Sequence, residues 1–296
     1  MNKGTILTAA LAALMLTGPP AQAREPRALE PSTDWLLDYA DERCTLTRGF
    51  GEGRDALRLQ VDSHGSAHDF RILLAGRSIP ASRDPSGAVQ YRLTPDTTDR
   101  QAPALLGKAG QLNAVFFTAT FGPDVGTPEL QGSREEDYER RQALRTAHPD
   151  FEASVSDMRV ALDHRSTFRL QLGDMTAPLA ALRACLDDLY AHWGLDPERQ
   201  KTLSMPPFPD ESTVARTQRS YPGRKLTKGE SALIPVRVMV DAEGKATSCH
   251  VQSRSADEAF SRAVCEGLAG PYRPALDAEG RAVASVFNTG VVYIMQ

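Results

Sequence analysis

The chain has 296 residues, of which 24% are charged, and its formal net charge at pH 7 is −4. This mildly acidic balance disfavours electrostatic attraction to polynucleotides, so proteins that hold nucleic acid against a basic face are excluded as a class. The length is sufficient for two folded domains, each with its own hydrophobic core.

The N-terminus has the pattern of a secretory signal peptide. Lys3 precedes an apolar run over residues 6–16, glycine and proline end that run, and small residues surround Ala23. The run is shorter than the roughly twenty residues that span a bilayer. We therefore expect residues 1–23 to be cleaved after Ala23. The exported chain would lie in the periplasm without a membrane span, and the loss of Lys3 changes its net charge from −4 to about −5.

Residues 31–196 are expected to form a β-rich, mostly antiparallel domain to which no activity can be attached. Its strand-like runs, separated by Gly, Pro, Asp and Ser, are residues 44–50, 56–62, 69–75, 89–93, 114–121, 158–162 and 167–172. The charged residues 135–146 have the composition of a solvated helix. A helix capped by Thr176, with a leucine stripe that ends near Trp193, should close this domain over the sheet.

Residues 197–219 are expected to be a linker that contains proline. The sequence Met-Pro-Pro-Phe-Pro at 205–209 lies at its middle and favours extended polyproline conformations. Such a segment predicts a semi-stiff spacer between two modules.

The segment that follows predicts a β-hairpin. Isoleucine and valine occupy every second position over residues 234–240, which is the period of a strand with one buried face. Turn-forming residues continue to Gly244, and residues 246–252 can return as the partner strand. Pro235 removes a backbone donor from the first strand, which predicts an edge or bulge position for that residue.

A helix and a closing strand complete the chain. Ser255 with Glu258 three positions later predicts a helix start, and the apolar stripe continues from Phe260 to Leu268. Residues 283–295 form a long β-rich segment. The order of elements is therefore strand, strand, helix, strand, and the whole chain is predicted to be α+β.

This ordered combination resembles the C-terminal domain of TonB-type energy transducers over about residues 215–296, with the small domain itself at 220–296. The residues that match the family pattern are Tyr221, Pro222, Gly229, Gly244 and Pro274. The chain departs from the family because neither a retained membrane helix nor a long Pro/Lys spacer is found. The resemblance implies a ββαβ domain that binds a protein partner, and an outer-membrane TonB-dependent receptor is the partner it suggests.

The resemblance also implies that an extended partner segment adds as a strand beside the last strand of the sheet. The residues of this candidate edge are Val283, Ser285, Phe287, Thr289, Val291 and Tyr293 on one face, with Asn288 among the intervening residues. A proline at Asn288 or Val292 should abolish strand addition. A role of the same strand in the core or in a dimer edge is the competing interpretation.

The chain contains four cysteines, which allow three pairings. An oxidising compartment favours disulfides, and placing one bridge in each domain favours Cys44 with Cys185 and Cys249 with Cys265. A catalytic thiol or a metal site is the competing interpretation, but the sequence contains no C-x-x-C motif.

The sequence contains no Gly-x-Ser-x-Gly elbow, no glycine-rich phosphate loop and no His-Glu-x-x-His helix. His64 and His68 have a metal-ligand spacing only on a helix, whereas their flanks predict a loop. Asp187 and Asp188 diverge by about 100° on a helix and do not converge on a substrate. We therefore expect a protein-binding module without catalytic residues, cofactor or metal. The alternative is an envelope enzyme or scaffold whose active part lies in the N-terminal domain.

Overall fold

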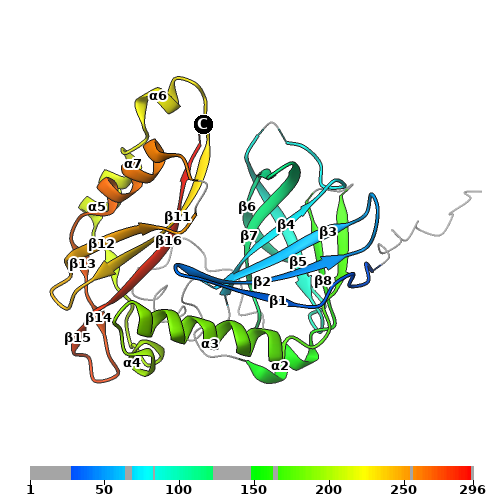
Figure 1. The fold of residues 1–296 in the computed structure, drawn as a ribbon, viewed down its shortest axis with the longest axis horizontal. Helices are drawn as coiled ribbons and strands as arrows, with labels where there is room; N and C mark the ends of the chain where they lie inside the picture. The colour runs from blue at the N-terminus through cyan, green and yellow to red at the C-terminus, as the bar shows by residue number, and fades with distance from the viewer. Residues whose placement is uncertain are drawn as a thin grey trace, which may run out of the picture.

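Figure 1 shows the computed structural model of the protein, which describes residues 28–63, 69–82, 84–122, 148–162, 166–253 and 256–294. The expected signal peptide at 1–23, the charged segment at 135–146, the histidines His64 and His68, and Ser255 lie outside the described residues. Within these ranges, no helix has both the length and the apolar character needed to cross a membrane.

The larger part of the fold is a curled, nine-stranded antiparallel sheet (Figure 1). Its strands are β1 (Leu36–Ala40), β2 (Arg43–Phe50), β3 (Leu57–Ser63), β4 (Asp69–Gly76), β5 (Ser86–Leu93), β6 (Arg100–Ala109), β7 (Leu112–Thr120), β8 (Asp157–Ala161) and β9 (Thr167–Gln171). They are arranged in the order β1-β2-β3-β4-β7-β6-β5-β8-β9. The predicted mostly antiparallel sheet is thus confirmed.

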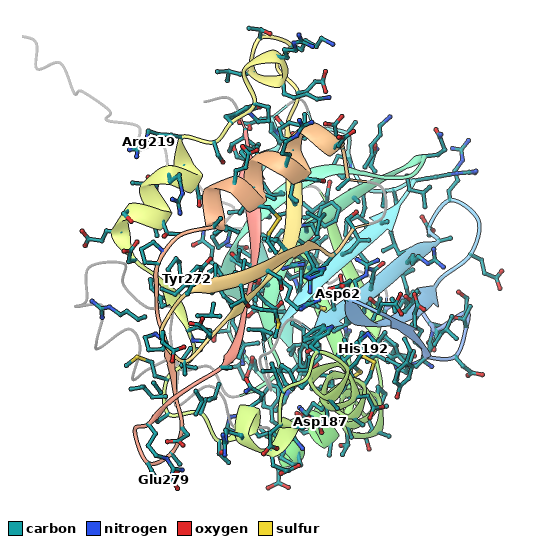
Figure 2. The ribbon with its side chains drawn as sticks, turned by 60° about the vertical axis from the view of Figure 1, so that its left-hand side comes forward. Asp62, Asp187, His192, Arg219, Tyr272 and Glu279 are labelled. Atoms are coloured by element: carbon teal, nitrogen blue, oxygen red, sulfur yellow. A yellow bond between two sulfur atoms is a disulfide. The ribbon has the colours of Figure 1, made fainter. Side chains whose placement is uncertain are left out.

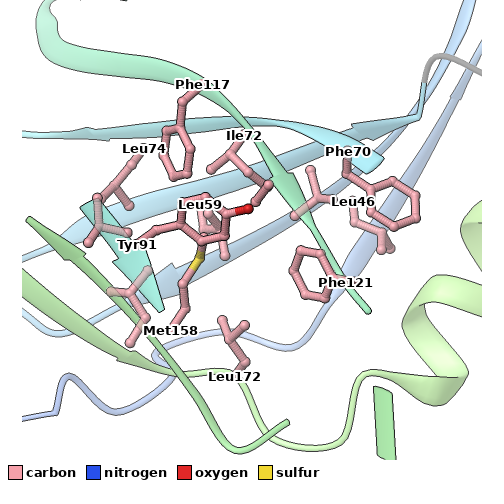
Figure 3. Packing of buried hydrophobic residues seen from close by; sticks show 14 of the residues in the cluster. Leu46, Leu59, Phe70, Ile72, Leu74, Tyr91, Phe117, Phe121, Met158 and Leu172 are labelled. Atoms are coloured by element: carbon pink, nitrogen blue, oxygen red, sulfur yellow. The ribbon is translucent and has the colours of Figure 1, made fainter. Parts of the chain in front are cut away.

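The inside of the curled sheet is filled by apolar side chains from alternate strand positions (Figure 3). In β4, for example, Phe70, Ile72 and Leu74 are fully buried. The Phe70 ring packs edge-on against Phe121 at a centroid distance of 5.7 Å. Burying one such side chain stabilises the fold by roughly 1.5–3 kcal/mol, so this interior is the main stabilising core.

A short N-terminal segment bridges the two ends of the curled sheet. The Leu29 N–H donates to the Arg169 carbonyl in β9 over 2.7 Å, and the Ser32 N–H donates to the Gly49 carbonyl in β2 over 2.9 Å. These bonds satisfy backbone groups that an open sheet would leave unpaired at its edges.

Two helices lie against the large sheet, α2 (Pro149–Ser154) and α3 (Thr176–His192). The leucine stripe of α3 is buried as expected, with Leu179, Leu182 and Leu189 in the core of the large sheet. A disulfide joins Cys185 in α3 to Cys44 in β2. The cap differs from the prediction, because the Asp174 carboxylate, and not the Thr176 hydroxyl, accepts the Thr176 N–H over 2.8 Å.

All seven predicted strands of this sheet are present, but β1 and β6 were not predicted. The β1 side chains are exposed or half-buried, so the strand has no apolar alternation. Strand β6 contains Pro103 and Gly107, which usually signal turns. Pro103 is tolerated because the pairing of β6 with β7 begins only at Ala104.

The C-terminal part contains a three-stranded antiparallel sheet in the order β12-β11-β16. The main elements of this part are β11 (Ala232–Val240), β12 (Ala246–Val251), α7 (Glu258–Leu268) and β16 (Ser285–Tyr293). The short helix α6 (Gly223–Leu226) precedes them. Three short strands lie between α7 and β16, namely β13 (Tyr272–Arg273), β14 (Ala275–Leu276) and β15 (Ala282–Val283). The order hairpin, helix and closing strand agrees with the expectation. The cap of α7 is Asp257, whose carboxylate accepts the Ala259 N–H over 2.9 Å.

The prediction of an extended linker at 197–219 is wrong, because this segment forms helices and a short strand. It contains α4 (Pro197–Lys201), β10 (Phe208–Pro209) and α5 (Glu211–Gln218), and β10 pairs with β13. Arg216 in α5 donates to the Gly267 carbonyl at the end of α7 over 2.9 Å. Capping carboxylates at Asp196 and Asp210 start the two helices, and they outweigh the local proline signal.

The two sheets contact each other through side chains that face neither core. Arg237 of β11 is buried, pairs with Glu42 in the turn before β2, and lies over the Trp193 ring at 4.1 Å. Val286 of β16 packs in a small apolar cluster with Leu186 of α3 and its neighbours. One face of the C-terminal sheet is therefore turned toward the large sheet and α3.

Candidate functional site

The candidate site is the outer edge of β16, the last strand of the C-terminal sheet. Strand β16 pairs with β11 along its full length, from Ser285 with Val240 to Tyr293 with Ala232. Among the residues that the structure describes, no strand pairs with its other side. The register continues without a bulge through Gly290, so the edge is straight enough to receive another strand.

The direction of the unpaired backbone groups follows from Pro235. In an antiparallel strand, the N–H and C=O of one residue point to the same neighbour, and successive residues alternate. The Pro235 carbonyl accepts the Gln252 N–H over 2.9 Å, so Pro235 is directed toward β12. Gly290, its partner in β16, is therefore directed away from β11. Asn288 and Val292 share this outward direction.

This geometry corrects the prediction that Pro235 occupies an edge or a bulge, because β11 is the central strand of the sheet. The missing donor falls at the point where β12 has just ended at Val251. Only the carbonyl of Pro235 then needs a partner, and Gln252 provides it.

A groove of about 380 Å³ follows the free edge between β16 and α5. Phe287, Thr289 and Val291 contribute to its β16 wall, and Val214 and Thr217 contribute to its α5 wall. No charged side chain lines the groove. Figure 2 shows α5, which ends before the labelled Arg219, beside α7 on the same side of the C-terminal sheet.

Aromatic side chains form both ends of the groove. At one end, the Tyr221 ring lies 5.3 Å from that of Tyr293. At the other end, Phe287 contacts the buried Tyr272, labelled in Figure 2, and Phe208, which is 47% exposed. The exposed Phe208 extends an apolar surface beyond the groove itself.

Two tyrosines at and beside the groove, Tyr293 and Tyr272, have raised pKa values. Burial raises the pKa of Tyr272 well above its ordinary value of 10.0, and its hydroxyl donates to the Leu268 carbonyl over 3.0 Å. Burial also raises the pKa of Tyr293, an effect that the hydrogen bond with Ser220 partly opposes. Because no charged side chain lines the groove, it suits apolar side chains rather than ions.

The structure brings four residues of the predicted edge to the groove, namely Phe287, Thr289, Val291 and Tyr293. Ser285 is buried and donates to the Gln200 side chain over 2.6 Å. Asn288 faces the large sheet, where its side chain accepts from Gln252 at 3.4 Å. Val283 does not belong to this strand, because it pairs with Ala275 in the β14–β15 hairpin.

The residues of the suspected family motif have structural roles around the same sheet. Tyr221 donates its hydroxyl to the Glu230 carbonyl over 2.6 Å, Pro222 precedes α6, and Gly229 has a positive φ of 65°. Gly244 is required at its position, since a Cβ atom there would lie 2.2 Å from the Tyr272 carbonyl oxygen and 3.4 Å from Pro274. The Tyr272 N–H donates to the Gly244 carbonyl over 2.7 Å, which holds the β11–β12 turn against β13.

The second disulfide joins Cys249 of β12 to Cys265 of α7. With Cys44–Cys185, it completes the pairing that was favoured from the placement of the cysteines. Two disulfides fit an extracytoplasmic protein, because reducing compartments seldom preserve them. In the described part of the chain, no group of three His, Cys, Asp or Glu side chains is arranged to hold a metal ion.

A larger cavity of about 680 Å³ lies at the seam of the curled sheet, next to Leu29. Its acidic lining residues Glu30, Glu52 and Asp55 are exposed to solvent. This cavity therefore lacks the gathering of buried polar groups that would favour an active site.

Sequence reasoning missed the α5 wall of the groove, because residues 211–218 were assigned to a linker. The only local signal was Asp210 with the helix-forming composition that follows it. No family model, no curated protein and no solved structure matches this chain.

Proposed function

We propose that this protein is an exported, non-enzymatic protein-binding module of the bacterial cell envelope. In this proposal, residues 220–296 are a TonB C-terminal-like domain, and an extended partner segment adds as a strand to β16. The partner class is an outer-membrane TonB-dependent receptor, and the location is the periplasm after cleavage behind Ala23. The observation that carries the proposal is the unpaired edge of β16 beside an apolar groove.

The energetics of such an edge favour an extended peptide over a folded surface. Asn288, Gly290 and Val292 each direct one N–H and one C=O outward, which a partner strand can pair along its backbone. Each backbone hydrogen bond contributes about 1 kcal/mol net, and apolar side chains entering the groove add roughly 25 cal/mol per Å² buried. Backbone pairing supplies affinity, while the groove selects alternate side chains.

The test is an amide-shift titration of the oxidised, full exported chain with an extended peptide from the plug region of a TonB-dependent receptor. We expect shifts along Ser285–Tyr293 and along α5, whose side chains form the opposite wall. Val292→Pro removes an outward backbone donor and should abolish the shifts. Val292→Ala keeps that donor and is the matched control, which should retain most of the affinity.

A peptide methylated on alternate backbone nitrogens provides a second control. Methylation of the residues whose N–H groups point to β16 should abolish binding, whereas methylation of the other set should not. Absence of shifts at millimolar peptide, or equal binding by both methylated peptides, would refute strand addition. Shifts along β16 that depend on protein concentration without peptide would show a dimer edge instead.

A further inference from the structure

The large sheet places one cationic side chain, that of Arg71, against the face of β16 at Gly290. Arg71 lies in β4 between the buried residues Phe70 and Ile72, so its side chain points to the outside of the curled sheet. A Cβ atom added at Gly290 would lie 3.6 Å from an Arg71 guanidinium nitrogen. The guanidinium therefore covers the middle of β16, where Gly290 leaves room because it has no side chain.

The charge of Arg71 is incompletely compensated. Within the described residues, the Arg71 side chain forms no hydrogen bond and no ion pair within 4 Å. Asp62, its cross-strand neighbour in β3, also accepts hydrogen bonds from Thr45 at 2.5 Å and from the Gln60 side chain at 3.1 Å (Asp62 is labelled in Figure 2). Arg43 adds a second positive charge nearby.

Burial reinforces this imbalance. Loss of solvent lowers the pKa of Arg71, the negative charge of Asp62 raises it, and the positive charge of Arg43 lowers it again. A guanidinium in such surroundings interacts more strongly with an added carboxylate than a fully solvated one would. The surroundings of Gly290 thus favour an anionic side chain.

Strand geometry determines where that side chain must lie in the partner. Residues paired across two strands point to the same face, with Cβ atoms about 4.5–5.5 Å apart. The partner residue paired with Gly290 therefore points to the face of Arg71. Its two neighbours point to the opposite face, into the groove with Thr289 and Val291.

We propose that the partner segment has the pattern apolar–acidic–apolar, with Asp or Glu paired with Gly290 and bound by Arg71. This inference rests on the proposed strand addition and makes the large sheet part of the binding site. A carboxylate at that position can accept both parallel N–H groups of the guanidinium. Selectivity then comes from two parts of the chain that are far apart in sequence, since Arg71 belongs to the large sheet and Gly290 to the C-terminal sheet.

The experiment measures fluorescence anisotropy with the oxidised, full exported chain and three labelled peptides. They share alternating valine and threonine residues and differ only in a central Glu, Gln or Lys. We expect the Glu peptide to bind at least about tenfold more tightly than the Gln peptide, as is usual for a hydrogen bond to a charged group. The Lys peptide should bind most weakly.

Variants at Arg71 assign the preference to this side chain. Arg71→Gln should reduce the Glu-to-Gln ratio to within about twofold, and Arg71→Glu should favour the Lys peptide. Urea unfolding of each variant checks that it is folded. The comparison of the three peptides on the unmodified protein does not depend on those variants.

The outcomes separate this inference from the proposed function. Equal binding of all three peptides, abolished by Val292→Pro, would overturn the acidic specificity and leave strand addition intact. A Glu preference that persists unchanged in Arg71→Gln would also overturn the inference. Failure of every peptide to bind would refute strand addition itself, and with it the role of Arg71.

Discussion

The two disulfides should differ in how strongly they stabilise the fold, and loop length gives the expected difference. Cys44–Cys185 joins residues separated by 141 positions, whereas Cys249–Cys265 joins residues separated by 16. In the chain-entropy model, a crosslink stabilises by reducing the freedom of the unfolded chain, and the effect increases with the logarithm of the loop. The model gives about 5 kcal/mol for the long loop and about 3 kcal/mol for the short one.

Paired alanine variants test this difference. Cys44→Ala/Cys185→Ala should lower the free energy of unfolding by about 2 kcal/mol more than Cys249→Ala/Cys265→Ala. Burial acts in the same direction, because both cysteines of the long loop are fully buried and their replacement also leaves a small cavity.

The assay is urea unfolding under oxidising conditions, followed by tryptophan fluorescence and far-UV circular dichroism. The chain has two tryptophans, and both Trp35 and Trp193 pack against the core of the large sheet. The fluorescence of Trp35 therefore reports the part that contains Cys44–Cys185, and that of Trp193 also reports the contact with the C-terminal sheet through Arg237. An equal or larger loss in the Cys249→Ala/Cys265→Ala variant would refute the loop-length reasoning.

Two further predictions concern stability. Hydrogen bonds from Arg169 lower the pKa of Asp157 below its ordinary value of 3.8. The ionised carboxylate therefore stabilises the fold above pH 3.8, and this contribution is lost as the pH falls toward the lower pKa that Asp157 has in the folded protein. In the Asp157→Asn variant, the urea unfolding midpoint should change less with pH between about pH 2.5 and about pH 6 than in the unmodified protein. An equal pH dependence of the midpoint in both proteins would contradict the assignment. Gly244→Ala should destabilise by more than Gly280→Ala, because both glycines have positive φ but only the first would place a Cβ against the Tyr272 carbonyl. Gly280→Ala should cost about 1 kcal/mol. Equal unfolding temperatures of the two variants would contradict this.

Local patterns predicted much of the fold. Alternating side chains identified β11, a strand-like run between turn residues identified β4, and the apolar stripes identified α3 and α7. The exposed strand β1 and the proline-containing strand β6 carried no such pattern, and long-range pairing made them strands. The prediction of an extended linker at 197–219 was wrong for a similar reason. Helix capping and contacts with α7 and β13 outweighed the proline signal of this segment.

The candidate site was predicted only in part. A resemblance indicated the last strand, and four of its side chains line the groove. Nothing near those residues in the sequence indicated Val214 and Thr217 as the opposite wall. Nor could it indicate Arg71, whose guanidinium lies beside Gly290 although more than two hundred positions separate the two residues in the sequence.

The amino-acid sequence by itself determined the features that neighbouring residues control: the two-residue and 3.6-residue periodicities, the turns at glycine, and the cysteines available for crosslinking. The tertiary structure decided which strand edge is left unpaired, which helix forms the second wall of the groove, and which charge faces it. These depend on the packing of residues far apart in the chain. Side-chain periodicity specifies the face that a strand buries, but the partner at each of its edges is specified only when the whole sheet assembles.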